Sequence, residues 1–184
     1  MTWRPLSLAA ACLSLGATPA LAGEVYAGAF DHAPSLHIGA ADEEHGVDIQ
    51  VGVRSERIDT FRHIGRPRAY VLLSKNLAGQ TDFASAGLLW RHDFGSRIYG
   101  QIGLGLAIHD GVAYPSEQRG RLDRRPLGSR ILFQEEASIG YRASPRWAIE
   151  ATYVHISNAH LWTDINPGMD DIGGRLVYRF GGAP

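Results

Sequence analysis

A histidine, a serine and an acid near the end of the chain have the residue types of a hydrolytic triad. His155 and Ser157 are two residues apart, and Asp170 follows after a loop. A serine hydroxyl becomes an effective nucleophile when an imidazole accepts its proton, and a carboxylate on the other ring nitrogen fixes the imidazole tautomer. Residues i and i+2 of a strand share a face, with Cα atoms about 6.5–7 Å apart. The serine and the imidazole are therefore within reach of each other if residues 146–158 form a strand.

The acid joins them if the segments 146–158 and 170–180 pair as a hairpin. A cross-strand neighbour lies about 5 Å away, so Asp170 can reach the imidazole from the adjoining strand. Asp171 is the alternative acid, but its parity directs it to the opposite face, which favours Asp170. Asn158 follows the serine and offers an amide N–H to an oxyanion. On these grounds we predict a serine hydrolase site.

Eight segments have the alternation of apolar and polar residues that predicts β-strands. They cover residues 24–30, 46–54, 68–76, 81–92, 97–108, 129–142, 146–158 and 170–180. Turn signals separate several of them, at residues 93–96, 143–145 and 166–168. The sequence therefore predicts an all-β protein, an eight-stranded antiparallel barrel.

The apolar face of these strands favours an outer-membrane barrel over a soluble, lipocalin-like periplasmic one. The narrow interior of an eight-stranded barrel would not hold so many large side chains, whereas lipid would accept them on the outside. The opposite face is rich in glycine and polar residues, which suits a polar interior. Glu135 falls on the lipid-facing parity, and its role stays open. Six aromatic residues are candidates for interfacial girdles: Trp90, Tyr141, Trp147, Tyr153, Tyr178 and Phe180.

The N-terminus has the features of a secretory signal peptide. Arg4 precedes an apolar run over residues 6–15, and Ala20-Leu21-Ala22 provides a small-residue cleavage site. We predict that residues 1–22 are removed, together with Cys12, and that residues 23–184 form one transmembrane barrel domain. If that domain begins in the periplasm, the loops 31–45, 76–81, 109–128 and 159–169 are extracellular. The serine, histidine and acid then lie at the outer leaflet.

The remaining charged residues allow predictions about nucleic acid, metal ions and the phosphate groups of a substrate. The chain has 18 Lys and Arg residues against 19 Asp and Glu residues, so no nucleic-acid partner is predicted. The pairs His92-Asp93 and His109-Asp110 lack the spacing of metal ligands, and we predict neither a metal nor another cofactor. Four arginines of one loop either bind phosphate groups of a substrate or are simply solvated: Arg119, Arg121, Arg124 and Arg125.

The segment from His155 to Ala159, followed by Asn166-Pro167-Gly168 and an acid, resembles the signature of the lipid A 3-O-deacylase family, the PagL-type acyloxyacyl hydrolases. The resemblance covers residues 68–180. It implies an outer-membrane esterase that acts on lipid A of lipopolysaccharide, with Ser157 as nucleophile, His155 as base and Asn158 in the oxyanion hole. Glutamate is the usual acid of the family where this chain has Asp170.

A glycine usually contributes a backbone N–H to the oxyanion hole at the position that His160 occupies in this chain. The function predicted from the sequence is hydrolysis of the 3-O-linked 3-hydroxyacyl chain of lipid A. The alternatives are a phospholipase-type esterase at the same site, and a non-catalytic structural barrel with a degenerate site. A homodimer is a further hypothesis that the sequence leaves open.

Overall fold

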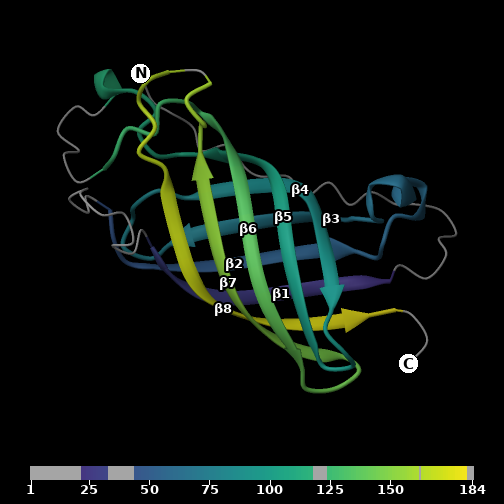
Figure 1. Cartoon of the computed structure of the whole chain (residues 1–184). Coiled ribbons are helices and arrows are strands. Elements are labelled where there is room, and N and C mark those ends of the chain that lie inside the picture. The colour runs from purple at the N-terminus through teal and green to yellow at the C-terminus, as the bar shows by residue number, and fades with distance from the viewer. Residues whose placement is uncertain (1–21, 33–43, 118–123, 162, 182–184) are drawn as a thin grey trace, which may run out of the picture.

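The protein is a single closed β-barrel, as the sequence predicts (Figure 1). The computed structural model describes residues 22–32, 44–117, 124–161 and 163–181. The strands are β1 (Gly23–His32), β2 (Val47–Ser55), β3 (Arg68–Asn76), β4 (Phe83–Asp93), β5 (Ile98–His109), β6 (Ile131–Arg142), β7 (Trp147–Ser157) and β8 (Met169–Phe180). Two short 3₁₀ helices, η1 (Asp59–Ile64) and η2 (Pro115–Glu117), lie in connections. No helix in these described ranges is long and apolar enough to cross a membrane.

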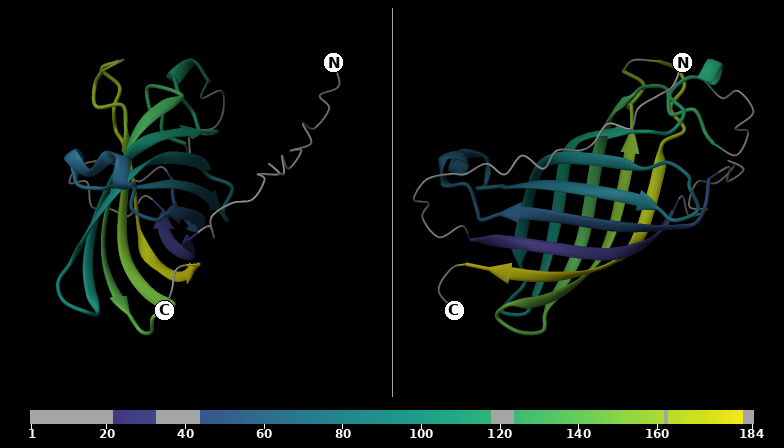
Figure 2. Two further views of the ribbon diagram at one scale, coloured as in Figure 1. Left: turned by 90° about the vertical axis from the view of Figure 1, so that its right-hand side faces the viewer. Right: turned by 180° about the vertical axis from the view of Figure 1, so that it is seen from behind.

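Each strand pairs antiparallel with its neighbours in the chain, and β1 closes the barrel by pairing with β8. The closing register runs from Gly23 opposite Phe180 to His32 opposite Asp171. Figure 2 shows the strands inclined around one continuous wall, with β1 and β8 side by side. Closure leaves no strand edge unpaired, which is what a barrel in lipid requires.

The barrel has two ends, which we name by what they carry. The site end holds the connections before β2, β4, β6 and β8. The terminus end holds the start of β1, the end of β8 and the other three connections.

The predicted strand limits differ from the observed ones by a few residues. For example, β6 begins at Ile131 rather than at residue 129, because Gly128 turns the chain with a φ of 79°.

The outer wall is apolar, as predicted for a surface in contact with lipid. Large aliphatic side chains from β1 to β8 are exposed on it. They include Val25, Val51, Val53, Val71, Leu73, Ile102, Leu104, Leu106, Ile108, Ile139, Ile149 and Leu176. At the terminus end Trp147 packs against Tyr178, with ring centroids 4.8 Å apart, which fits an interfacial position.

The interior is filled by buried charged side chains that pair with one another. Arg54 donates to both Glu150 carboxylate oxygens, at 2.8 and 2.9 Å, and to Glu136 at 3.3 Å. Arg175 donates to Glu136 at 2.8 Å. Near the terminus end, Arg91 forms a bidentate pair with Glu24 at 2.6 and 2.7 Å. This network is the polar plug that the strand pattern predicts.

Two of the earlier predictions fall largely outside the described residues. Of the predicted signal peptide, residues 1–22, only Ala22 is described. Arg119 and Arg121 also lie outside the described residues. The signal peptide and any role of these two arginines stay predictions.

Replacement of Arg54 by alanine is expected to destabilise the barrel by about 3–5 kcal/mol, because it leaves the carboxylates of Glu136 and Glu150 without their shared cation. Arg57→Ala is the control, since Arg57 makes an exposed contact with Asp93 at 3.5 Å, worth about 1 kcal/mol at most. Urea unfolding of the refolded proteins in detergent measures both. Equal midpoints for the two variants would contradict the role given to Arg54.

Candidate active site

The β7–β8 hairpin positions the residues with catalytic chemistry. Along β7, Val154 and Ile156 are buried in the interior, so Tyr153, His155 and Ser157 face outward. His155 lies directly opposite Asp170 of β8. The alternation along one strand and the register between two strands therefore bring the imidazole, the hydroxyl and the carboxylate to one face.

His155 and Asp170 are in direct contact. The imidazole Nδ1 lies 2.6 Å from Asp170 Oδ1. The Tyr153 hydroxyl donates to the same oxygen, also at 2.6 Å. The Asp170 carboxylate is only 2% exposed although it stands on the outward face, so its charge is stabilised by these two donors rather than by water. Asp171, the alternative acid, faces the interior, where Gln50 Nε2 donates to its Oδ2 at 2.8 Å.

Ser157 shares the outward face and is partly exposed. Its cross-strand neighbour on β6 is Phe133, and that of His155 is Glu135. Glu135, His155 and Asp170 thus form one row across β6, β7 and β8. The lipid-facing parity predicted for Glu135 is therefore correct, and its carboxyl is exposed beside the imidazole.

Gly168 lies against the edge of the imidazole away from Asp170. A Cβ built on this glycine would be 2.8 Å from His155 Cε1 and 3.4 Å from Nε2. Its φ of 67° is also in the left-handed region, which favours glycine. The loop before β8 can therefore approach the ring closely, and it limits the positions that the imidazole can take.

Asn158 holds the loops at the site end together. It is fully buried, and its Nδ2 donates to the carbonyls of Leu127 at 3.1 Å and Ile165 at 2.6 Å. Its backbone N–H donates to Asn166 Oδ1 at 2.8 Å. The His160 N–H donates to Asn158 Oδ1 at 2.8 Å. The two residues predicted for the oxyanion hole thus use these donors within the loop in this structure.

The chain after Ser157 has an uncommon backbone. Ala159 and His160 have φ values of 52° and 57°, in a region that residues with a side chain rarely adopt. Two consecutive residues of this kind make a tight turn directly behind the serine. Such conformations cost energy and persist where the surroundings fix them, which is what the hydrogen bonds of Asn158 do.

Of the four predicted phosphate-binding arginines, the structure describes two. The Arg124 guanidinium donates to the Gly79 carbonyl, and the Arg125 backbone N–H donates to Glu44 Oε1 at 3.2 Å. Both contacts link the β5–β6 connection to other loops of the site end. These contacts give the two residues a structural part in the loop, and phosphate binding by the arginines stays a prediction.

Sequence reasoning missed two contributors to the site. Tyr153 was predicted as a girdle aromatic, whereas its hydroxyl is bonded to Asp170. Tyr153 and His155 are two residues apart on the same strand and therefore share a face, and this spacing could have indicated that Tyr153 belongs to the site. Gly168 was noted as part of a motif, but its contact with the ring depends on how the loop folds back.

The fold and the site together define a class of protein. This is an eight-stranded barrel of the outer-membrane type, with an imidazole–carboxylate pair and a serine on its outward, apolar wall. A family model described as lipid A 3-O-deacylase (PagL) matches residues 62–179. The chain belongs to that family.

Solved structures show the same fold. The crystal structure of the outer membrane enzyme PagL aligns with a TM-score of 0.59 and 17% identity, over 84% of this chain and 98% of that one. Neisserial surface protein A aligns with a TM-score of 0.57 and 19% identity, over 86% and 97%. A de novo designed transmembrane β-barrel aligns with a TM-score of 0.55 and 12% identity, over 89% and 98%. No curated protein sequence matches the chain.

A methyl group at Gly168 is expected to displace the His155 ring, and Gly79→Ala is the matched control. Both glycines have positive φ, 67° and 78°, so alanine costs roughly 1–2 kcal/mol of local strain at each. A Cβ at Gly79 meets nothing within 4 Å, unlike one at Gly168. The His155 ring signals in NMR spectra of detergent-solubilised protein should shift in Gly168→Ala only. Unchanged signals in both variants would show that the loop does not restrain the ring.

Proposed function

We propose that this protein is an outer-membrane esterase that hydrolyses the 3-O-linked 3-hydroxyacyl chain of lipid A. The observation that carries the proposal is the contact between His155 and Asp170 on the outward face beside Ser157, at one end of an apolar wall. Membership of the lipid A 3-O-deacylase family supports the choice of substrate. A polar trio on such a wall needs a function or partners, because unsatisfied polar groups are costly in lipid.

In the proposed reaction, His155 accepts the Ser157 proton as the serine oxygen attacks the ester carbonyl. The Asp170 carboxylate holds Nδ1, so that Nε2 is the nitrogen that accepts the proton, and it stabilises the imidazolium that forms. Collapse of the tetrahedral intermediate breaks the ester bond, and His155 returns the proton to the lipid A alcohol. Water, activated by the same imidazole, then releases the fatty acid from Ser157.

The location of the site suits a substrate that stays in its leaflet. Ser157 ends β7 and Asp170 is the second residue of β8, so both lie at the border between the apolar wall and the loops. An ester near the headgroup of a lipid lies at the same depth. We propose that the site end is the extracellular end, which places the site at the outer leaflet, where lipopolysaccharide is found.

Oxyanion stabilisation is assigned to the loop that follows Ser157. Asn158 and the His160 N–H are the proposed donors. Each has to exchange a hydrogen bond within the loop for one to the substrate oxygen. The short distance along the chain from Ser157 to these donors supports the assignment.

Ser157→Ala and His155→Ala are each expected to lower deacylation by about 10³-fold or more, since either change removes the nucleophile or its base. Ser96→Ala, in an exposed turn at the opposite end, is the control and should keep full activity. Mass spectra of lipid A from cells expressing each variant would show loss of one 3-hydroxyacyl mass only with the parent and the control. Purified Ser157→Ala protein that releases fatty acid at the parental rate would end the proposal.

The same spectra distinguish the alternatives. A phospholipase-type esterase would leave lipid A unchanged and produce lysophospholipids. A structural barrel with a degenerate site would change neither lipid pool.

Tyr153→Phe should lower kcat by about 10- to 100-fold, because a hydrogen bond to a charged acceptor contributes about 1.5–3 kcal/mol. The ring stays in place, and only the donor to Asp170 Oδ1 is removed. KM should change little, since the hydroxyl acts on the acid and not on the lipid. Tyr178→Phe, beside Trp147 at the terminus end, is the control. Full activity of Tyr153→Phe would mean that His155 alone is sufficient to hold the carboxylate.

A further inference from the structure

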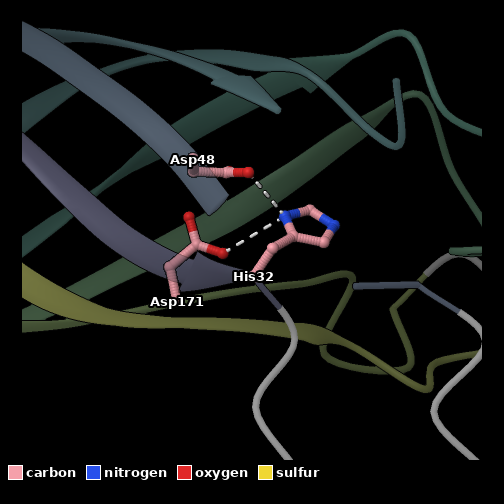
Figure 3. Close-up of side chains that lie close together, drawn as sticks. All are labelled: His32, Asp48 and Asp171. Carbon is pink, nitrogen blue, oxygen red and sulfur yellow. Dashed lines mark ion pairs between the residues drawn. The ribbon is translucent and has the colours of Figure 1, made fainter. Parts of the chain in front are cut away.

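A second group of ionisable side chains lies inside the barrel, on the other side of the wall from the proposed active site. His32 ends β1, Asp48 is near the start of β2, and Asp171 is near the start of β8. These three strands are neighbours across the closure of the barrel. Figure 3 shows the three side chains directed toward one another. Each residue is at most 2% exposed.

The distances among these groups are those of ligands around one metal ion. His32 Nδ1 lies 3.0 Å from Asp48 Oδ1 and 3.6 Å from Asp171 Oδ1. One ligand atom from each residue lies within 4.8 Å of the other two. Ligands bonded at about 2.0–2.2 Å to one transition-metal ion are separated by similar distances. The group therefore has the size of a coordination sphere.

Two atoms of this group form ion pairs within it but make no hydrogen bond of normal geometry in the described part of the chain. His32 Nδ1 and Asp171 Oδ1 make no hydrogen bond with any of the residues that the structure describes. Buried nitrogen and oxygen atoms are rarely left in this state. Both atoms point into the space between the three side chains (Figure 3), so a ligand in that space would satisfy both.

The opposite sides of the same groups are held by a second layer of contacts. His32 Nε2 lies 3.1 Å from Glu44 Oε2, and Glu44 in turn accepts from the Thr81 hydroxyl at 2.9 Å. A proton on Nε2 directs the Nδ1 lone pair into the group, as in the carboxylate–histidine pairs around bound metals. Ser74 donates to Asp48 Oδ2 at 2.7 Å, and Asn76 Nδ2 donates to Asp48 Oδ1 at 2.8 Å, which leaves that oxygen a second lone pair for a ligand. Gln50 donates to Asp171 Oδ2, so Oδ1 is the oxygen left for a ligand.

The charge of the group also calls for a cation. Asp48, Asp171 and Glu44 bring three carboxyl groups to one buried imidazole. The nearby Arg175 donates to Gln50 Oε1 at 2.9 Å and pairs through its other terminal nitrogen with Glu136. Buried carboxylates need compensation by a cation or by protons. A protonated imidazole supplies one positive charge, whereas a divalent metal ion supplies two.

We propose that His32, Asp48 and Asp171 bind a divalent transition-metal ion, such as Zn²⁺, in the barrel interior. One imidazole nitrogen with two carboxylate oxygens suits zinc and its neighbours in the first transition series, whereas Ca²⁺ and Mg²⁺ prefer oxygen ligands alone. The ion links β8, β1 and β2 where the barrel closes, so its role is structural. The proposal is independent of the esterase activity.

The adjacent residues Asp170 and Asp171 provide a matched pair of variants to test it. The full mature protein is refolded in detergent, treated with chelator and titrated with Zn²⁺ by calorimetry. The parent should bind one equivalent, and Asp171→Asn should lower the affinity by at least about 100-fold. Asp170→Asn removes the neighbouring carboxylate on the outer face and should bind zinc as the parent does. The reverse pattern would place the zinc at the His155 pair and overturn the proposal.

Two measurements on the parent alone cover the case in which Asp171→Asn does not fold. The midpoint of thermal unfolding should rise with zinc concentration and stay unchanged with equal concentrations of Mg²⁺. Zinc X-ray absorption should show one imidazole nitrogen among oxygen ligands. Absence of stoichiometric zinc binding by the parent would refute the metal site and leave protons as the compensation for the buried carboxylates.

Discussion

The register of β8 against its two neighbours is the constraint on which the rest of the structure depends. Asp170 is opposite His155 of β7, and Asp171 is opposite His32 of β1. Consecutive side chains of a strand point to opposite faces, so one acid reaches the outer wall and the next reaches the interior. A slip by one residue would exchange the two carboxylates. Asp170 would then point into the interior and Asp171 to the outer wall, so that neither carboxylate would keep its present hydrogen-bond partners.

The interior network makes such a slip costly. Arg54 and Arg175 share the carboxylate of Glu136, and Arg54 also pairs with Glu150. These groups come from β2, β6, β7 and β8, so each strand is tied to strands that are not its neighbours. A charge moved out of this network would be buried without a partner, which is far more unfavourable than a lost surface contact. The polar interior therefore fixes the register that the outer surface needs, although it has no part in the proposed chemistry.

The sequence was sufficient for the local part of this arrangement. Alternation predicts eight strands, and the hairpin of β7 and β8 places His155 beside Asp170 because only a short loop separates them. The pairing of β1 with β8 joins residues at opposite ends of the chain, and the group of His32, Asp48 and Asp171 follows from that closure. The alternation of apolar and polar residues along one strand does not show which distant strand it pairs with, so it could not predict this group. For a related reason the sequence did not predict the hydrogen bond of Tyr153 to Asp170 or the contacts by which Asn158 holds the loops. Hydrogen-bond partners depend on the direction of side chains and on the paths of loops, and residue type alone does not give either.

The hydrogen bonds of Asn158 raise the question of whether the loop can also stabilise an oxyanion. The His160 N–H donates to Asn158 Oδ1, so it has to leave one acceptor to reach another. Exchange of a neutral hydrogen bond within the protein costs about 0.5–1.5 kcal/mol. A donor to a developing oxyanion lowers the barrier by about 2.7–4 kcal/mol. The exchange is therefore favourable in the transition state, when the oxygen carries charge, and unfavourable before it.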